Sequence, residues 1–145
     1  LIAAGQSGVQ IDLIVRGACM LPARVKGFTD NIRVRSIIGR YLEHSRVYYF
    51  RQGVQDELYL ASADWMSRNM VRRIELAWPI TDEAQKQKLI DECLLAYLYD
   101  GQDAWDMLPD GSYQSARGIG PNPGHSAQAA LMARYGLHHA KANKP

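Results

Sequence analysis

The segment Glu43–Trp65, EHSRVYYFRQGVQDELYLASADW, predicts a β-hairpin around which the fold is organised. Two short runs, Val47–Phe50 and Leu58–Ala61, are rich in aromatic and aliphatic residues, which is typical of strands. The polar stretch between them, around Gly53 and Gln55, supplies the turn. The hairpin is therefore the local element on which the rest of the interpretation is built.

The chemically active residues of this segment stand at the ends of the two strands. His44 and Arg46 are two residues apart at the start of the first strand, so their side chains are expected on the same face. Ser62 and Asp64 follow the second strand, and the hairpin would return them towards the imidazole and the guanidinium. An acid or base, a fixed cation and a hydrogen-bond acceptor would then share one rim, which suits the handling of phosphoryl groups.

Length and composition indicate a globular domain. The chain has 145 residues, of which 47% are hydrophobic and 22% charged, so it can bury a core. No apolar run approaches the ~20 residues of a membrane span and no signal peptide is present, so we expect a cytoplasmic location. The opening LIAAGQSGVQ has no initiator Met, and we expect a fragment of a longer protein. Cys19 and Cys93 lack metal-type spacing and are expected to be reduced thiols.

The net charge of +2 hides two segments of opposite sign. Residues 16–73 contain eleven basic and five acidic residues, a net +6, and ten of the eleven are arginine. Residues 75–110 contain two basic and nine acidic residues, a net −7. Because arginine matches phosphate oxygens bidentately, the basic segment favours an anionic partner, although a solvated basic face is the alternative. Candidates for a polyanion path are Arg33, Arg35 and Arg40.

The remaining pattern predicts an α/β fold. Ile11–Val15 is a nearly continuous apolar run, typical of a central strand covered on both faces, and Ile32–Ile38 is a second strand with a wet face near Arg33 and Arg35. Arg16 follows the first of these strands, and ligands of open α/β sheets bind at the carboxyl ends of strands. Arg16 is therefore well placed to face a site.

The other expected elements are weaker signals. Residues 1–10 are expected to hold a cut helix and a turn at Gly8, followed by a loop at 18–31, a turn at 66–69 and a strand at 72–78. A helix capped by Thr81 is expected next, with an apolar stripe that reaches Leu98. A loop-rich stretch at 100–124, a helix at 127–135 capped by Ser126 and a frayed end from His138 complete the chain. The expected organisation is a single domain, 1–145, with a core at 1–110 and a loop plus terminal helix at 111–145. His125, His138 and His139 have no acidic or Cys partner at ligand spacing, so no metal site is expected there.

The hairpin residues resemble one half-site of the phospholipase-D-like superfamily, whose pattern is His-x-Lys followed by Gly-Ser-x-Asn. The equivalents here are His44-Ser45-Arg46 and Ser62-Ala63-Asp64. Arg stands in place of Lys and Asp in place of Asn, which suggests a degenerate half rather than a hydrolytic one. The resemblance implies a mixed sheet with flanking helices.

A longer resemblance is more specific. The segments IDLIVRG, DNIRVRSIIGRYLEHSRVYYF and YLASADWMSRNMVRRIEL, in this order and at matching intervals, closely resemble the carboxy-terminal region of bacterial polyphosphate kinase. The similarity covers about Ala3 to Leu98, and loosely Ser126 to Ala133. It implies a phosphotransferase that moves phosphate reversibly between ATP and polyphosphate.

The resemblance also implies site residues and partners. It places Arg16 and His44 at the ATP/ADP site, with His44 as the candidate general acid/base opposite a phosphohistidine. The phosphohistidine and the arginines that hold Mg²⁺ belong to the preceding domain, so the isolated chain is expected to be inactive. Histidine chemistry agrees, since an unperturbed imidazole titrates at about pH 6.5. Arg46 either clamps phosphates or orients His44, and Asp64 is a candidate to fix the tautomer of His44.

The implied partners are polyphosphate, ATP and the upstream domains of the same chain. A homo-oligomer is expected, peripheral membrane association is compatible with the resemblance, and nucleic acid is not an expected partner. Two alternatives stay open: a phospholipase-D-like phosphodiesterase half, and a non-catalytic module that binds polyanions through the basic segment.

Overall fold

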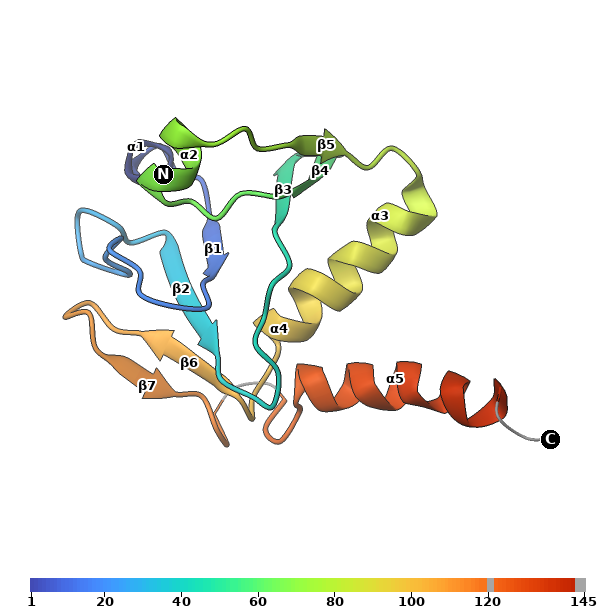
Figure 1. Cartoon of the computed structure of the whole chain (residues 1–145). Helices are drawn as coiled ribbons and strands as arrows, with labels where there is room; N and C mark the ends of the chain where they lie inside the picture. Colours follow the sequence, from blue (N-terminus) through green and yellow to red (C-terminus); the bar gives the residue numbers. More distant parts are fainter. Residues whose placement is uncertain (120–121, 143–145) are drawn as a thin grey trace. The chain divides into compact units, whose positions relative to one another are not determined.

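The computed structural model describes residues 1–119 and 122–142, the side chains of 137–142 excepted. The chain divides into two compact units, one made of residues 1–43 and 96–145 and the other of residues 44–95. Figure 1 labels the helices and strands of both. Since the hairpin and its flanking segments form a unit of their own, each unit is described by itself.

The first unit is built on a four-stranded mixed sheet (Figure 1). Its strands are β1 (Ile11–Ile14), β2 (Ile32–Ile37), β6 (Ala104–Met107) and β7 (Tyr113–Ser115), in the order β1-β2-β6-β7. β1 pairs with β2 in parallel, and the other pairs are antiparallel. The prediction that β1 is a central strand is wrong, because within this sheet it forms an edge and pairs with β2 alone.

The core of this unit lies on both faces of β2. Side chains alternate between the two faces of a strand, so Ile32 and Val34 pack into one apolar cluster and Ile37 into another. β1 follows the same alternation: Ile11 and Leu13 contact the first cluster and Ile14 the second. The apolar run was therefore correctly interpreted as a strand with apolar contacts on both faces.

The stretch 100–124 was predicted as loop, yet it contains β6 and β7. Asp100 organises this region, since its side chain is 1% exposed and accepts hydrogen bonds from the backbone N–H groups of Gln102, Asp103 and Ala104. Its other oxygen accepts from the N–H of Ala127, 2.7 Å away, at the start of α5. The segment after Asp110 thus contributes a strand to the sheet as well as a loop and a helix.

Helices complete the first unit. They are α1 (Ile2–Gln6), α4 (Ala96–Leu98) and α5 (Ala127–Ala142). The predicted helical start and the turn at Gly8 are confirmed, with Gly8 at φ +92°. Ser126 caps α5 as predicted by accepting a bond from the N–H of Ala129, but the helix runs on to Ala142 instead of fraying from His138. Residues 143–145 lie outside the described residues.

The second unit contains the predicted hairpin. β3 (Val47–Gln52) and β4 (Gln55–Ala61) pair antiparallel, and β5 (Ala77–Pro79) adds a third strand beside β4 (Figure 1). Gln52 pairs with Gln55, which leaves a two-residue loop whose first residue, Gly53, has φ +60°. Glycine reaches this conformation without steric cost, so the turn is encoded locally.

Three helical segments of this unit differ from the sequence expectations. They are α2 (Ser67–Arg72), α3 (Glu83–Leu89) and the π-helix η1 (Ile90–Leu95). α2 replaces the predicted turn at 66–69 and shortens the predicted strand 72–78 to β5. Asp82, not Thr81, caps α3, since its carboxylate accepts from the N–H of Gln85 at 2.8 Å. The half-buried apolar stripe continues through η1, which contacts β3.

Candidate functional site

Arg16 lies directly beyond the carboxyl end of β1, as the sequence predicted. β2 runs parallel to β1, so the loop after β2 leaves the sheet at the same edge. Arg16 reaches this loop and donates from Nη1 to the backbone oxygen of Glu43 at 2.7 Å. The side chain is exposed and forms no ion pair with any residue that the structure describes. The other N–H groups of the Arg16 guanidinium are therefore available to an anion.

Gln128 of α5 fixes the loop that presents Glu43. Its amide accepts from the Tyr41 N–H at 2.9 Å and donates to the Tyr41 oxygen at 2.8 Å, as a neighbouring strand would. The same nitrogen contacts the Glu43 carboxylate at 2.5 Å. A Cβ on Gly39 would collide with the Gln128 amide, so this close approach requires glycine there. Gln128 is 87 residues from Tyr41 in sequence, and no local pattern announced its role.

In the second unit the structure brings His44, Arg46 and Asp64 together. Arg46 donates from Nε to Asp64 Oδ1 at 2.9 Å, and its Nη2 lies 3.2 Å from Nε2 of His44. Its Nη1 donates to the His44 backbone oxygen at 3.3 Å. The bond to Asp64 raises the pKa of Arg46 above its ordinary value. All three guanidinium nitrogens of Arg46 are thus engaged, which favours an orienting role over a phosphate clamp.

Asp64 lies on a segment that the hairpin holds in place. Tyr48 of β3 stacks on Trp65, with ring centroids 5.5 Å apart, and its hydroxyl donates to the Ala63 oxygen at 3.3 Å. Burial raises the pKa of Tyr48, so the phenol stays a hydrogen-bond donor. The side chain of Asn69, 4% exposed, donates to the Asp64 backbone oxygen at 3.1 Å. None of these contacts was anticipated from the sequence.

Other predicted participants are engaged elsewhere. The Ser62 hydroxyl donates to the Glu75 carboxylate and accepts from the Leu76 N–H, so the expectation that it returns to the imidazole is wrong. Arg33 pairs with Asp12, and that hydrogen bond raises the pKa of Arg33. Of the rim residues that the sequence suggested, the Ser62 hydroxyl is therefore engaged with Glu75 and Leu76 instead.

Arg35 also has a structural role. It forms a bidentate pair with Asp106, at 2.8 and 2.9 Å, and its Nη1 contacts backbone oxygens at the end of α4. Its side chain is 18% exposed. Arg40 lies over the ring of Tyr41, 5.5 Å from the centroid. Arg35 is therefore a structural residue, whereas Arg33 stays 60% exposed beside Asp12, and its place on a polyanion path, like that of Arg40, stays a prediction.

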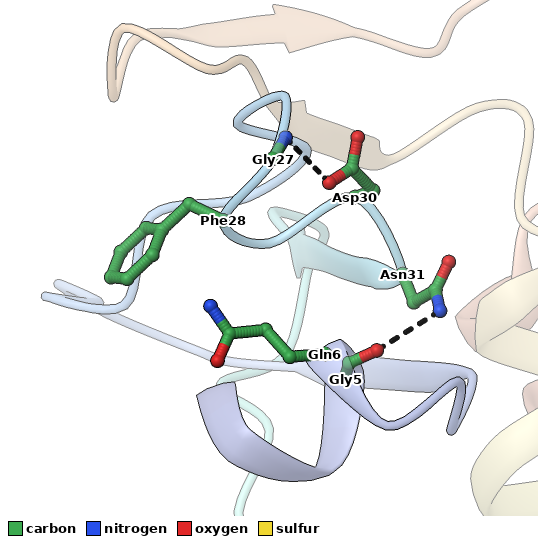
Figure 2. A pocket seen from close by; sticks show the side chains of 6 residues that line it. All are labelled: Gly5, Gln6, Gly27, Phe28, Asp30 and Asn31. Atoms are coloured by element: carbon green, nitrogen blue, oxygen red, sulfur yellow. Dashed lines mark hydrogen bonds between the residues drawn. The ribbon is translucent and has the colours of Figure 1, made fainter.

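The hollows of the first unit do not coincide with the predicted site residues. One of about 360 Å³ lies between α1 and the turn at 27–31, where Gly27 donates to Asp30 and Asn31 donates to the Gly5 oxygen (Figure 2). Neither Arg16 nor His44 lines it. A second, of about 310 Å³, is lined by Glu43 and Gln128 together with apolar and aromatic residues. Neither of these two hollows is lined by Arg16 or His44.

The described part of the chain has neither a metal-binding cluster nor a membrane-spanning helix. No group of three or more His, Cys, Asp or Glu side chains there is arranged to hold a metal ion. The side chains of His138 and His139, which were considered with His125 as metal ligands, lie outside the described residues. Among the described helices, none has the length and apolar character of a membrane span. Cys19 and Cys93 form no disulfide within the described part of the chain, and their reduced state stays a prediction.

Comparison with known proteins identifies the family. The family model for "Polyphosphate kinase C-terminal domain 2" matches residues 1–128. The chain belongs to the polyphosphate kinase family. It is 49% identical over 136 residues to a polyphosphate kinase of Paraburkholderia phytofirmans, and 48% identical over 134 residues to one of Synechocystis. These matches cover 94% and 92% of the chain but only 19% and 18% of the relatives.

A solved structure supports the fold. The crystal structure of polyphosphate kinase from Porphyromonas gingivalis matches with a TM-score of 0.85 and 36% identity, over 99% of this chain and 22% of that chain. The prediction of an α/β phospholipase-D-like fold is confirmed by this similarity. The chain spans about a fifth of the length of its polyphosphate kinase relatives.

Proposed function

We propose that this chain supplies part of the ATP and phosphoryl site of a polyphosphate kinase, which transfers the terminal phosphate of ATP reversibly to polyphosphate. Membership of the family supports the reaction class. The observation that carries the site is the exposed guanidinium of Arg16, held at a strand end by a single bond to Glu43. Phosphoryl transfer depends mainly on positioned cations and electrostatic stabilisation, and such a group can supply both.

His44 is the second proposed contributor, in addition to Arg16. His44 is exposed, and it lies three residues before β3, where Arg46 contacts both its ring and its backbone oxygen. In the proposed reaction His44 either donates a hydrogen bond to a phosphoryl oxygen or exchanges a proton with the attacking or leaving group. Mg²⁺ neutralises phosphate charge in such reactions, and the proposed Mg²⁺ ligands lie in other domains of the protein.

The remaining assignments follow from the same proposal. ADP and polyphosphate are the products or substrates according to direction, and the upstream domains complete the site. We propose a cytoplasmic homo-oligomer whose isolated 145-residue portion has no turnover.

The test is His44→Ala in the protein that carries this chain. Polyphosphate synthesis from ATP is expected to fall by about 10²–10⁴-fold, the usual contribution of a proton-transfer group. Circular dichroism and thermal unfolding should be unchanged because the ring is exposed. His125→Ala is the matched control, since it removes another imidazole that is not among the proposed site residues. Near-normal synthesis by His44→Ala would refute the proposal.

A further inference from the structure

The guanidinium of Arg46 is bonded at every nitrogen. Nε donates to Asp64 Oδ1 at 2.9 Å, Nη1 donates to the His44 backbone oxygen at 3.3 Å, and Nη2 faces His44 Nε2 at 3.2 Å. The Arg46 side chain is only 17% exposed. These contacts leave Arg46 little freedom to approach a ligand, and they concentrate its donors on one residue, His44.

The chemistry of the contact at Nε2 determines where the ring proton lies. A guanidinium has N–H donors and no acceptor, whereas a ring nitrogen of histidine can donate or accept. The Nη2 to Nε2 hydrogen bond can therefore form only if Nε2 offers its lone pair. A ring whose Nε2 is a lone-pair acceptor is neutral and carries its proton on Nδ1.

We propose that Arg46, held by Asp64, is a positioning residue that fixes His44 as the neutral Nδ1–H tautomer. This inference rests on the proposed function of His44. Nδ1 has no hydrogen-bond partner among the described residues and the ring is exposed, so Nδ1–H is the group that His44 offers to a phosphoryl oxygen. For Nε2 to take a proton, Arg46 would first have to leave it.

Asp64 fixes the plane of the Arg46 guanidinium. Its carboxylate holds Nε, and this fixes the direction of Nη2 because the guanidinium is rigid and planar. Asp64 is itself held through its backbone oxygen by Asn69 and through its neighbours by the Tyr48–Trp65 stack. A lysine at position 46 would have one flexible ammonium, which cannot reproduce three contacts of fixed geometry.

The tautomer can be observed directly. The protein that carries this chain is labelled with ¹⁵N at its histidine rings, and magic-angle-spinning spectra are recorded well above the ordinary imidazole pKa of about 6.5. The His44 signals are assigned by their loss in His44→Gln. We expect Nδ1 to be protonated and Nε2 to be unprotonated. A proton on Nε2 in the unsubstituted protein would overturn the proposal.

Two substitutions test the cause. Arg46→Met and Arg46→Lys are expected to redistribute the ring proton between the two nitrogens, while Arg51→Lys is expected to leave it on Nδ1. Arg51 is the matched control because it lies on β3, the strand that follows Arg46, and donates to the Gly53 oxygen. An unchanged tautomer in Arg46→Met would show that Arg46 does not set it.

Kinetics link the tautomer to the reaction. Arg46→Lys is expected to lower kcat for polyphosphate synthesis by about 10²-fold, the loss typical of a misplaced catalytic group, with an unchanged KM for ATP. Asp64→Asn should act in the same direction but less, because its amide oxygen still accepts from Nε. If His44→Ala keeps its activity, the proposed function fails whatever the tautomer. If His44→Ala is inactive and Arg46→Met keeps full kcat, the positioning role alone fails.

Discussion

Arg16 and Arg46 are two arginines next to strand ends whose guanidinium groups are in opposite situations. Arg16 is exposed and uses one N–H, on the Glu43 backbone oxygen. Arg46 is mostly buried, is ion-paired to Asp64 and uses all three nitrogens. Arg16 has most of its N–H donors left for a ligand, whereas each guanidinium nitrogen of Arg46 already makes a contact within the protein.

The difference teaches how to interpret a basic segment. Ten arginines occur in residues 16–73, and their number favoured an anionic partner. Arg33, Arg35 and Arg46 already have carboxylate partners within the chain. An anion that competes for such a residue must first break an existing pair, so an arginine without one binds at lower cost. Unused donors, rather than net charge, distinguish a candidate ligand contact from a structural arginine.

The sharpest test of this comparison is Arg16→Ala. Hydrogen bonds to charged groups contribute about 1.5–3 kcal/mol, so the affinity for ATP should fall by about 10–100-fold. Isothermal titration of ATP into the protein that carries this chain measures it. Arg117→Ala is the control, because Arg117 is also exposed and also donates to a backbone oxygen, that of Gln102. Equal losses for both variants would mean that Arg16 provides only general positive charge.

In contrast to Arg16→Ala, Arg35→Met is expected to lower the stability of the fold and to leave the affinity for ATP unchanged. This change leaves Asp106 and the carbonyl groups at the end of α4 without their donor, and should lower the free energy of unfolding by about 2–3 kcal/mol. Arg33→Met removes an exposed pair, with Arg33 60% exposed, and should cost about 1 kcal/mol or less. Urea titration measures both. At urea concentrations below the unfolding transition, both variants should bind ATP with unchanged affinity. A loss of affinity in folded Arg35→Met would contradict the distinction between structural and ligand-binding arginines.

A smaller effect is expected at Tyr48, which supports the segment that carries Asp64. Tyr48→Phe keeps the stack on Trp65 and removes the bond to the Ala63 oxygen, which is worth about 1 kcal/mol. Thermal unfolding and hydrogen exchange of β3 and β4 would report the loss. Tyr59→Phe is the comparison, since that hydroxyl contacts the Glu57 carboxylate of the same strand. A greater loss in Tyr59→Phe would show that the Tyr48 bond does not brace the hairpin.

The elements that the sequence predicted well are those with local signals. β1, β2 and the β3–β4 hairpin have apolar runs or alternation, and Gly53 marks the turn. β6 and β7 were missed because they are short and contain polar residues, and because β6 is specified by pairing with β2, some seventy positions earlier. The edge position of β1 is likewise a property of the assembled sheet, which a strand's own residues do not encode.

The candidate site divides in the same way. The hairpin register made the approach of Asp64 to Arg46 predictable, because both lie next to paired strands. Which side chain Asp64 would hold was not: the sequence suggested His44, and the structure shows a bond from Arg46. Gln128 came from a helix 85 residues beyond Glu43, and nothing near Glu43 pointed to it. Local register is readable from sequence, whereas long-range partners are not.

The last expected effect concerns Asp56, which anchors α3 to the hairpin and has no part in the proposed site. Hydrogen bonds from Lys86 at 2.6 Å, and then from Tyr49 at 3.0 Å, lower the pKa of Asp56. A carboxyl group whose pKa is lower in the folded state stabilises the fold above its unfolded pKa, about 3.9, and this contribution is lost as the pH falls through the folded value.

Amide hydrogen exchange of β3 and β4, measured in steps from neutral pH down to the acid transition, should therefore show protection falling below about pH 4. Asp56→Asn keeps the shape of the side chain but cannot titrate, so it should start with weaker protection and lose less of it in acid. Lys86→Met should reduce protection at neutral pH as well, because it leaves Asp56 without its cation. If unsubstituted protein and Asp56→Asn lost protection in parallel, the acid sensitivity would belong to other carboxylates. Polyphosphate synthesis at neutral pH should survive Asp56→Asn, since Arg16 and His44 are left as they are. This result would distinguish the Asp56–Lys86 pair, which stabilises the hairpin, from Arg16, which is open to a ligand.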